Sequence, residues 1–285
     1  IKPEYLVTAT DTGEPTFRHV TYEQYKANRE EADIELKQQF PLMHDVLKVL
    51  GIPTFGVEGF EADDVIGTLS EQLADENPEL QVAIFTSDKD TYQLIHGNIF
   101  VLSPDRNGSG ELKVIGQTEA FEKLAVHTDQ VVDYKALCGD SSDNIPGVKG
   151  IGPKTAATLL QRFGTLTGIY AALGLAGRVP LDERLKELMS QYEAEDQTKL
   201  KEAVEELRPH VINKLVEGQG EAWLSQGLAR IDTQVPIEFT LEKARLSDYN
   251  KAEAFRLFSE LGFESLKRHL PKDEFESQVQ ASLFG

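Results

Sequence analysis

The sequence predicts an α/β fold with a doubly wound, mostly parallel sheet, and two observations support this prediction. First, short apolar stretches typical of strands alternate with segments of helical periodicity; these stretches cover residues 5–10, 52–57, 82–85 and 99–102. Second, several of them run straight into acidic residues. The C-terminal ends of parallel strands meet along one edge of such a sheet, where α/β proteins bind ligands, so we expect these carboxylates to lie close together.

The first expected strand ends at Asp11 and Gly13. After an acidic stretch, apolar residues between 40 and 50 predict a helix that packs against the core, with Gly51 as its cap. The single tryptophan, Trp223, and Leu224 and Leu228 beside it are also expected to pack against the core.

The second strand leads into Glu61, Asp63 and Asp64 at the start of a helix, although acidic residues there are also favoured simply by the helix dipole. The third strand leads into Asp88 and Asp90, followed by a helix. A Gly-, Asn- and Ser-rich stretch at 107–110 predicts a hairpin-like turn before a further strand at 112–115.

Length and composition limit the class of protein. At 285 residues the chain exceeds a typical single domain, and we expect a core at 1–132, a helical region at 133–270 and a linker or tail at 271–285. No apolar run approaches the roughly 20 residues that span a bilayer, and no secretory signal is recognised. The single Cys138 excludes an internal disulfide and fits a reducing compartment, so a cytoplasmic protein without a membrane partner is expected.

The net charge of −19 argues against a general affinity for nucleic acid, because nucleic-acid-binding domains usually present a basic face. Net charge governs long-range attraction and does not decide what a local groove binds. The excess of carboxylates instead favours metal sites and a solvated acidic surface.

Residues 137–160 combine two kinds of chemistry in one run, LCGDSSDNIPGVKGIGPKTAATLL. Asp140 and Asp143 offer two carboxylates three residues apart, and three glycines then precede a helix that opens at Pro153. Such a glycine-rich turn before a helix start favours an anion site, since free N–H groups and the positive end of the dipole point outward. A hydrophilic loop before an ordinary helix N-terminus is the other interpretation. A phosphodiester would contact both a cation and an anion site of this kind.

Four residues further upstream share the spacing of one helical face: Tyr22, Tyr25, Lys26 and Arg29. Two aromatic rings and two cations on one face suit stacking on bases and pairing with phosphates. A surface helix with solvated cations is the other interpretation of this spacing.

Eight carboxylates are expected at one sheet edge, where they would repel strongly unless cations were bound: Asp11, Glu61, Asp63, Asp64, Asp88, Asp90, Asp140 and Asp143. Oxygen ligands without cysteine or clustered histidine favour Mg²⁺, with Mn²⁺ as the alternative. Two such ions are the usual device for phosphodiester hydrolysis.

Three stretches resemble the signature blocks of the 5′ nuclease (flap endonuclease) superfamily: EADDVIGTL, FTSDKDTYQL and the run at 137–160. They are most similar to the 5′→3′ exonuclease domains of bacterial DNA polymerase I. The resemblance implies a PIN-like core with a helical arch at about 15–40, a helix–three-turn–helix DNA-binding element, and two-metal cleavage of 5′-flap, nicked, gapped or RNA-primed DNA. It also implies a monomer associated with the bacterial nucleoid.

The resemblance further implies roles for individual residues. Lys26 and Arg29 would orient the scissile phosphate and act as catalytic residues. The DNA contacts would come from the arch and the glycine-rich element: Arg18, Tyr22, Tyr25, Lys26, Arg29, Gly147, Lys149, Gly150, Gly152, Lys154 and Thr155. A monovalent cation, K⁺, is expected on the carbonyls of that element.

The chain departs from the family pattern in three places, one of which is Thr10, where a hydrophobic residue usually precedes the Asp. No residues match the first strand and its metal-binding Asp, which suggests an N-terminal truncation and leaves a non-catalytic module for branched DNA as the alternative function. An extra segment at about 178–216 predicts charged amphipathic helices that pack among themselves or on the core. A phosphatase or small-nucleotide hydrolase is a third class, which would need neither the glycine-rich element nor the arch.

The C-terminal residues end in a short peptide that resembles the bacterial sliding-clamp-binding motif, in which Gln280, Leu283 and Phe284 would fill apolar pockets. A plain linker is the alternative interpretation.

Overall fold

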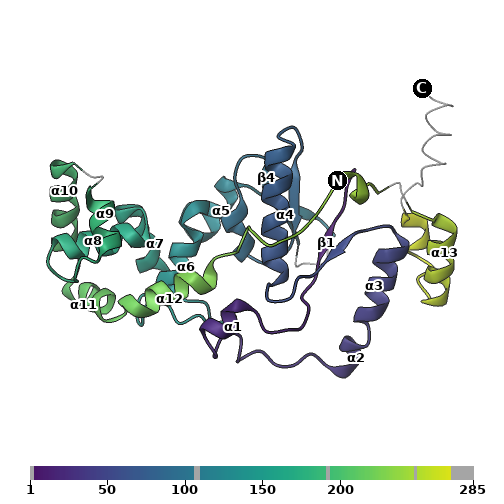
Figure 1. Cartoon of the computed structure of the whole chain (residues 1–285), viewed down its shortest axis with the longest axis horizontal. Coiled ribbons are helices and arrows are strands. Elements are labelled where there is room, and N and C mark those ends of the chain that lie inside the picture. Colours follow the sequence, from purple (N-terminus) through teal and green to yellow (C-terminus); the bar gives the residue numbers. More distant parts are fainter. Residues whose placement is uncertain (1–2, 106–109, 191–192, 247–248, 271–285) are drawn as a thin grey trace. The chain divides into compact units, whose positions relative to one another are not determined.

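The computed structural model describes residues 3–105, 110–190, 193–246 and 249–270 (Figure 1). The chain divides into two compact units. The first unit comprises Ile1–Thr16, Glu30–Leu69 and Thr233–Gly285, and the second comprises Phe17–Arg29 and Ser70–Asp232. The α/β class is confirmed, but the described strands form two small sheets and not one continuous sheet.

In the first unit, β1 (Thr8–Ala9) and β2 (Thr54–Phe55) form a parallel pair in which Thr8 lies opposite Thr54. The helical elements of this unit are α2 (Ile34–Lys37), α3 (Phe40–Val49), the first half of α4 (Ala62–Glu76), η3 (Leu241–Ala244), α13 (Lys251–Glu260) and η4 (Lys267–His269). Val65 and Leu69 of α4 are buried against Val235, and this small cluster holds α4 on the strands.

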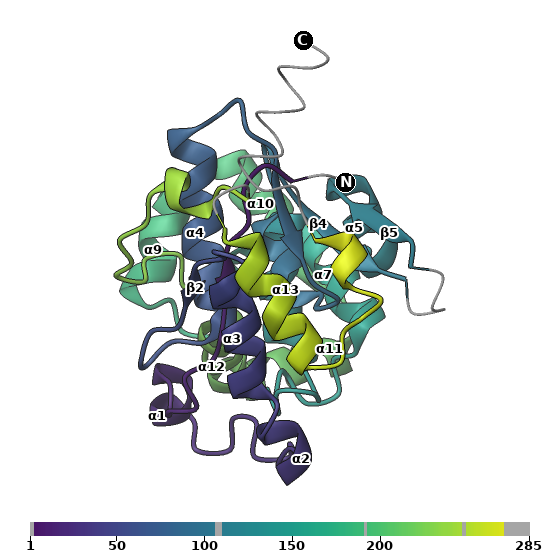
Figure 2. The same ribbon diagram turned by 90° about the vertical axis from the view of Figure 1, so that its right-hand side faces the viewer.

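The prediction that α3 packs its apolar residues into the core is wrong. None of its residues is buried, and Phe40, Leu42 and Met43 are all exposed by more than 40%. The helix instead contacts α13, and both views show the two side by side (Figures 1 and 2). Gly51 follows the helix with a φ of 68°, as expected for a residue that ends a helix.

In the second unit, β3 (Val82–Phe85) and β4 (Ile99–Pro104) are parallel, and β5 (Leu112–Ile115) is antiparallel to β4. Ile84, Val101 and Ile115 lie opposite one another in register and are all buried, so they mark the inner face of this sheet. The turn predicted at 107–110 lies mainly outside the described residues. The helix expected after Asp90 is a short 3₁₀-helix, η1 (Asp90–Leu94).

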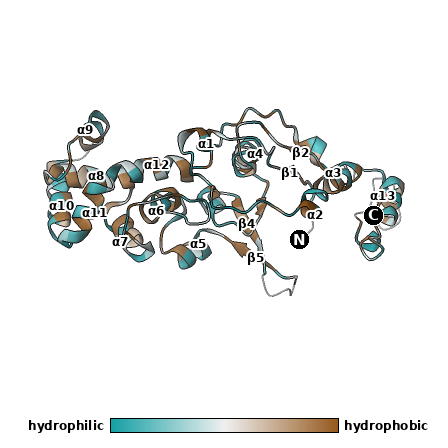
Figure 3. Ribbon diagram, turned by 90° about the horizontal axis from the view of Figure 1, so that it is seen from below, coloured by the Kyte–Doolittle hydropathy of each residue, from teal (hydrophilic) through white to brown (hydrophobic). Residues whose placement is uncertain are grey.

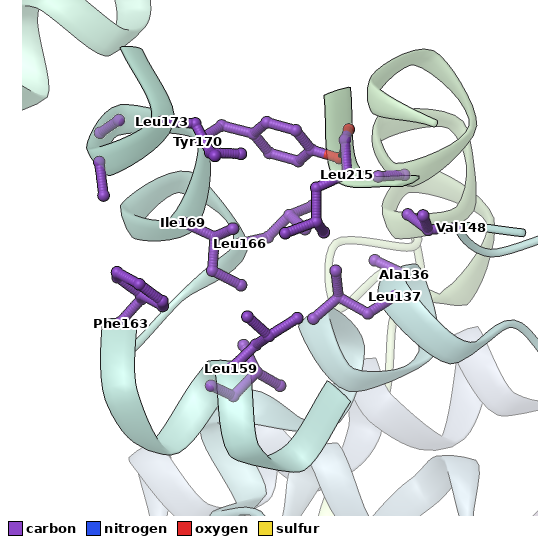
Figure 4. Close-up of a cluster of buried hydrophobic side chains, with 14 of the residues drawn as sticks. Ala136, Leu137, Val148, Leu159, Phe163, Leu166, Ile169, Tyr170, Leu173 and Leu215 are labelled. Atoms are coloured by element: carbon purple, nitrogen blue, oxygen red, sulfur yellow. Dashed lines mark hydrogen bonds between the residues drawn. The ribbon is translucent and has the colours of Figure 1, made fainter. Parts of the chain in front are cut away.

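The remainder of the second unit is helical. Besides α1 (Phe17–Thr21), its elements are α5 (Gln117–Leu124), η2 (Thr128–Gln130), α6 (Val131–Cys138), α7 (Pro153–Phe163), α8 (Leu166–Leu175), α9 (Glu183–Ser190), α10 (Ala194–Glu205), α11 (Pro209–Glu217) and α12 (Gln219–Ala229). Figure 4 shows side chains of α6, α7, α8 and α11 meeting in one apolar cluster, where the Tyr170 hydroxyl donates to the carbonyl of Leu215 at 3.1 Å.

The extra segment predicted at 178–216 forms helices α9, α10 and α11. Its buried residues, among them Leu185, Val204 and Ile212, belong to the same apolar cluster as α8. These helices carry both hydrophilic and hydrophobic stretches (Figure 3). The apolar stripe is therefore packing surface, as predicted. Trp223 and Leu228 of α12 also pack against apolar clusters, which confirms their predicted role.

None of the described helices combines the length and the apolar composition needed to cross a membrane. The tail at 271–285, including Gln280, Leu283 and Phe284, lies outside the described residues.

Candidate active site

An acidic loop, residues 139–145, follows α6. Its ends are joined by two backbone hydrogen bonds: the N–H of Asp140 donates to the carbonyl of Ile145 at 2.9 Å, and the N–H of Ile145 donates back at 2.8 Å. The loop is therefore a closed turn that carries Asp140 and Asp143 in fixed positions. Ser142 supports Asp140, since its backbone N–H donates to Asp140 Oδ1 at 2.8 Å and its hydroxyl at 2.6 Å.

Two glycines make this loop possible. Both Gly139 and Gly147 have positive φ values, of 72° and 61°. A Cβ on Gly147 would lie 2.2 Å from the backbone nitrogen of Gly139, and a Cβ on Gly139 would lie 2.7 Å from the carbonyl oxygen of Ile145. A side chain at either position would push the two ends of the acidic loop apart.

Lys135 of α6 lies between two of the predicted metal ligands. Its Nζ donates to Asp140 Oδ2 at 2.5 Å and also to Asp90 Oδ1. The lysine is buried, although most lysines are exposed. Asp88 adjoins this group, because its Oδ1 accepts from the N–H of Asp90 at 2.9 Å. These residues line a pocket of about 480 Å³.

The two carboxyls that share Lys135 have opposite pKa shifts. Burial, opposed by Lys135 and reinforced by Asp88, raises the pKa of Asp90 to about 6. Burial acts on Asp140 in the same direction, but hydrogen bonds from Lys135 and Ser142 outweigh it and lower its pKa to about 2. Burial also disfavours the charged form of Lys135, yet the attraction of Asp90 and the hydrogen bonds to both carboxyls raise its pKa. Asp90 and Asp140 thus place partly buried negative charge around a single ammonium, beside the exposed Asp88.

Asp143 joins the acidic loop to the preceding basic segment, residues 17–29. Its Oδ1 lies 2.5 Å from Nη2 of Arg29, its Oδ2 lies 3.7 Å from Nζ of Lys26, and the Tyr25 hydroxyl donates to Oδ2 at 3.2 Å. The N–H of Lys26 also donates to the carbonyl of Asp143 at 3.0 Å. The two predicted catalytic cations therefore contact a predicted metal ligand directly.

The prediction of one helical face through residues 22–29 is wrong. Helix α1 ends at Thr21, turns follow, and Lys26 has a φ of 55°, which no helix accommodates. Tyr25 is only 3% exposed and meets His19 edge-to-face, so its ring is not on the surface for base stacking. Tyr22 is partly buried in the same cluster.

Arg18 is also not placed as a surface DNA contact. The side chain is buried, Nε donates to the carbonyl of Leu228 at 2.9 Å, and Nη2 donates to the carbonyl of Arg230 at 2.7 Å. Its guanidinium binds the end of α12, where it satisfies backbone carbonyls.

Four of the predicted ligands belong to the first unit. Asp11 Oδ1 accepts from the N–H of Ala62 at 2.8 Å, and Asp64 Oδ2 accepts from the N–H of Glu61 at 2.9 Å. Asp64 is fully buried, and Asp63 is partly buried. Asp11 and Asp64 thus occupy the start of α4, where the helix dipole favours negative charge.

The glycine hairpin, residues 147–152, leads into the N-terminus of α7. Val148 and Ile151 are buried in the apolar cluster, while Lys149, Gly152 and Lys154 are exposed around the helix start, and Thr155 lies partly buried in its first turn. The first turn of α7 contains no acidic residue. The hairpin is therefore anchored from within and presents cations outward.

Gly150, in the same hairpin, has a φ of 82°, and its carbonyl accepts a hydrogen bond from Lys214 Nζ of α11 at 2.8 Å. An ammonium group is thus the cation at this carbonyl. The K⁺ ion predicted here stays a prediction.

The donor set of the second unit fits a hard divalent cation. Mg²⁺ keeps several waters and binds through one or two carboxylates together with substrate phosphates. Asp90 and Asp140, which already surround one cationic group beside a pocket, meet that requirement. Within the described ranges, no group of three or more His, Cys, Asp or Glu side chains is placed to hold a metal ion.

Lys135 and Asn28 also belong to the site, although neither was predicted from the sequence. Asn28 Nδ2 donates to the carbonyl of Ser141 at 2.7 Å, and this bond helps to hold the basic segment on the acidic loop. A signal for Lys135 was present, because a lysine among Val131, Val132, Ala136 and Leu137 is unusual in an apolar helix. The chain's cysteine, Cys138, is half-buried, and burial raises the pKa of its thiol to about 11, which agrees with a structural role.

Two sequence models of one family match successive parts of this chain. The "5′-3′ exonuclease, N-terminal resolvase-like domain" matches residues 1–125, and the "5′-3′ exonuclease, C-terminal SAM fold" matches residues 126–252. The chain belongs to the 5′-3′ exonuclease family. This membership confirms the resemblance found in the sequence.

Relatives of this 5′-3′ exonuclease chain include DNA polymerase I from several bacteria. The chain is 32% identical over 285 residues to that of Bacillus caldotenax, covering 99% of this chain and 29% of the relative. It is 36% identical over 265 residues to that of Treponema pallidum, covering 93% of this chain and 23% of the relative. It therefore spans less than a third of the length of these curated relatives.

Solved structures show the same fold for this 5′-3′ exonuclease chain. The T5 D15 protein co-crystallised with metal ions has a TM-score of 0.58 and 20% identity, covering 88% of this chain and 81% of that one. T5 5′-exonuclease with bound zinc has a TM-score of 0.56 and 21% identity, covering 79% and 73%. The PIN-like expectation for the fold is confirmed.

Proposed function

We propose that this chain is a divalent-metal-dependent, structure-specific 5′ nuclease that hydrolyses phosphodiester bonds of 5′-flap, nicked, gapped or RNA-primed DNA. The observation that carries the proposal is the pair Asp90 and Asp140 around one cation position, in a chain of the 5′-3′ exonuclease family. A related T5 flap endonuclease was crystallised with DNA and metal ions, which supports the same class of substrate. Family membership does not favour the non-catalytic alternative.

In this proposal the carboxylates would bind the metal ions, and the basic residues would bind the phosphate. Asp88, Asp90 and Asp140 would hold a divalent ion in the second unit, and Asp11, Glu61, Asp63 and Asp64 are proposed as metal ligands within the first unit. Asp143 completes the set of eight. Bound Mg²⁺ or Mn²⁺, two ions in all, would supply Lewis acidity and water of lowered pKa.

Lys26 and Arg29 would bind and orient the scissile phosphate. In the structure both cations are held at Asp143, so they are already fixed beside the acidic loop. Positive groups fixed in advance stabilise developing negative charge without further reorganisation.

Binding of the duplex would rely on the glycine hairpin and the start of α7. Lys149 and Lys154 are exposed there, and the backbone N–H groups of Gly150 and Gly152 adjoin them. Phosphates bind well at such helix starts. We place the protein, as a monomer, at the nucleoid of the bacterial cytoplasm, with the sliding clamp as a partner of the tail and K⁺ as a ligand of the hairpin.

The test is cleavage of a labelled 5′-flap DNA in Mg²⁺ and in EDTA. The unchanged chain is expected to cut near the junction in Mg²⁺ only. Asp140→Asn and Asp88→Ala should each lower the rate by about a hundredfold or more, because a ligand is lost at a position where charge must be balanced.

The control is Glu206→Gln, which changes an exposed carboxylate of α10 that pairs with Arg162 and should leave the rate unchanged. Cutting that continues in EDTA, or equal loss of activity in all three variants, would contradict the proposed function.

A further inference from the structure

Lys135 has an unusual environment for a lysine. It projects from an apolar helix, it is 8% exposed, and its ammonium is shared by carboxylates from two distant parts of the sequence. Asp90 begins η1, after β3, and Asp140 opens the acidic loop. The lysine is thus the cation that links two segments of the second unit.

The two carboxyls depend on this cation. Like charges held close together in a partly buried site destabilise each other unless a positive charge lies between them. Asp88 adds a third carboxyl next to Asp90. The Lys135 ammonium therefore stabilises this arrangement of carboxyls when no metal is bound.

The surroundings also give the ammonium somewhere to move. The pocket of about 480 Å³ is lined by Asp88, Asp90 and Asp140, and also by Val131, Tyr134 and Cys138, which share the spacing of one helical face with Lys135. A lysine is a point charge on a flexible stem, unlike a guanidinium with its rigid planar fork. Its head can leave the carboxylates while its stem remains packed.

We propose that Lys135 is a displaceable placeholder for a divalent cation, which keeps Asp90 and Asp140 in place before the ion binds and competes with it afterwards. This inference rests on the proposed metal site of the nuclease. Lys135 is a positioning residue in this scheme, and it does not contact the substrate.

Competition between the Lys135 ammonium and a divalent ion for Asp90 and Asp140 has a measurable consequence. Without the ammonium, the ion faces two uncompensated carboxylates and should bind more tightly, while the metal-free protein should be less stable. A lysine that merely orients the ligands would have the opposite effect, because its loss would weaken ion binding.

The experiment measures Mn²⁺ binding to the 285-residue chain in the absence of DNA, from the loss of the spin-resonance signal of free Mn²⁺. Lys135→Met keeps an unbranched stem and removes the charge. We expect its Mn²⁺ affinity to rise about tenfold, the effect of removing one competing charge at close range. Its melting temperature should fall in EDTA and rise with Mn²⁺ by more than that of the unchanged chain.

Lys135→Gln is the second variant, which retains hydrogen bonding if the methionine variant does not fold. Lys113→Met is the matched control, since Lys113 forms an exposed pair with Asp105 at 2.9 Å in the same unit, and it should bind Mn²⁺ as the unchanged chain does. Folding of Lys135→Met that requires Mn²⁺ would support the proposal.

If both Lys135 variants bind Mn²⁺ no more tightly than the unchanged chain, the placeholder proposal is wrong. The flap assay would then still decide the nuclease proposal. Absence of Mn²⁺ binding in every protein would overturn both. Tighter binding by the variants together with a failed flap assay would support the placeholder and contradict only the nuclease.

Discussion

Gly139 and Gly147 show how single residues shape the acidic loop. Each adopts a positive φ, and each leaves no room for a Cβ because the other strand of the turn passes directly over it. Asp140 of the loop is partly buried and Asp143 is buried, and the backbone that carries both depends on these two glycines.

Gly147→Ala is expected to destabilise the protein by about 3 kcal/mol or more, since a Cβ would collide with backbone and the left-handed φ adds further strain. Urea denaturation followed by circular dichroism measures the change in the free energy of unfolding. Gly227→Ala is the control: its Cβ would meet nothing within 4 Å in α12, and alanine should stabilise that helix by about 0.5–1 kcal/mol. Similar stability of the two variants would contradict the packing argument.

Arg18 is the second prediction at this scale. Arg18→Met leaves the carbonyls of Leu228 and Arg230 without this donor and should cost about 1.5–3 kcal/mol, the range for hydrogen bonds to a charged group. Arg162→Met removes an exposed pair with Glu206 and should cost less than about 1 kcal/mol. If Arg18→Met instead weakened flap binding at unchanged stability, Arg18 would be a DNA contact after all.

Among the elements, the basic segment shows how tertiary contacts override local pattern. Its spacing of aromatic and basic residues fits a helix, yet the chain turns so that Tyr25 is buried and Lys26, Asn28 and Arg29 reach the acidic loop. The hydrogen bonds of Tyr25 and Asn28 to the acidic loop, together with the ion pairs to Asp143, outweigh the weak helical preference of residues 22–29.

Asp143→Asn should release this segment. The substitution removes the charge that Lys26 and Arg29 share, so trypsin should cleave after these residues several times faster, because cleavage tracks the population of the opened segment. Asp129→Asn, at an exposed position of η2, is the control. Unchanged cleavage in the Asp143 variant would show that the remaining hydrogen bonds suffice to hold the segment.

At the scale of the whole molecule, the excess of acidic groups would make bound cations a condition for the proposed binding of DNA. The net charge of −19 opposes approach of a polyanion, while the cations at the glycine hairpin are few. Divalent ions on the carboxylates would reduce the negative charge where the phosphates are proposed to lie.

Flap binding is therefore expected to be at least about tenfold tighter in Ca²⁺, which occupies oxygen sites, than in EDTA at the same ionic strength. Fluorescence anisotropy of a labelled flap measures the affinity, and monovalent salt that matches the ionic strength of the Ca²⁺ buffer is the control. Equal affinities in the two buffers would mean that the protein's own cations carry the binding.

Local periodicity and residue type were enough to predict three features of the fold. These are the α/β class, the amphipathic helices at 178–216 and the acidic positions at strand ends. The exposed position of α3 and the course of residues 22–29 were not, since both depend on what packs against them. Lys135 lies 45 positions after Asp90 and 5 positions before Asp140. No local sequence pattern reveals that it links the two carboxyls.

The paired hydrogen bonds between Asp140 and Ile145 have a consequence for isotope exchange. Although they lie in a loop with exposed serines at its tip, the amide protons of these two residues should be replaced by deuterium as slowly as those of α6, while neighbouring loop amides exchange quickly. Such slow exchange would mean that the acidic loop opens only together with the helices around it, so Asp140 and Asp143 would keep their positions whenever α6 is folded.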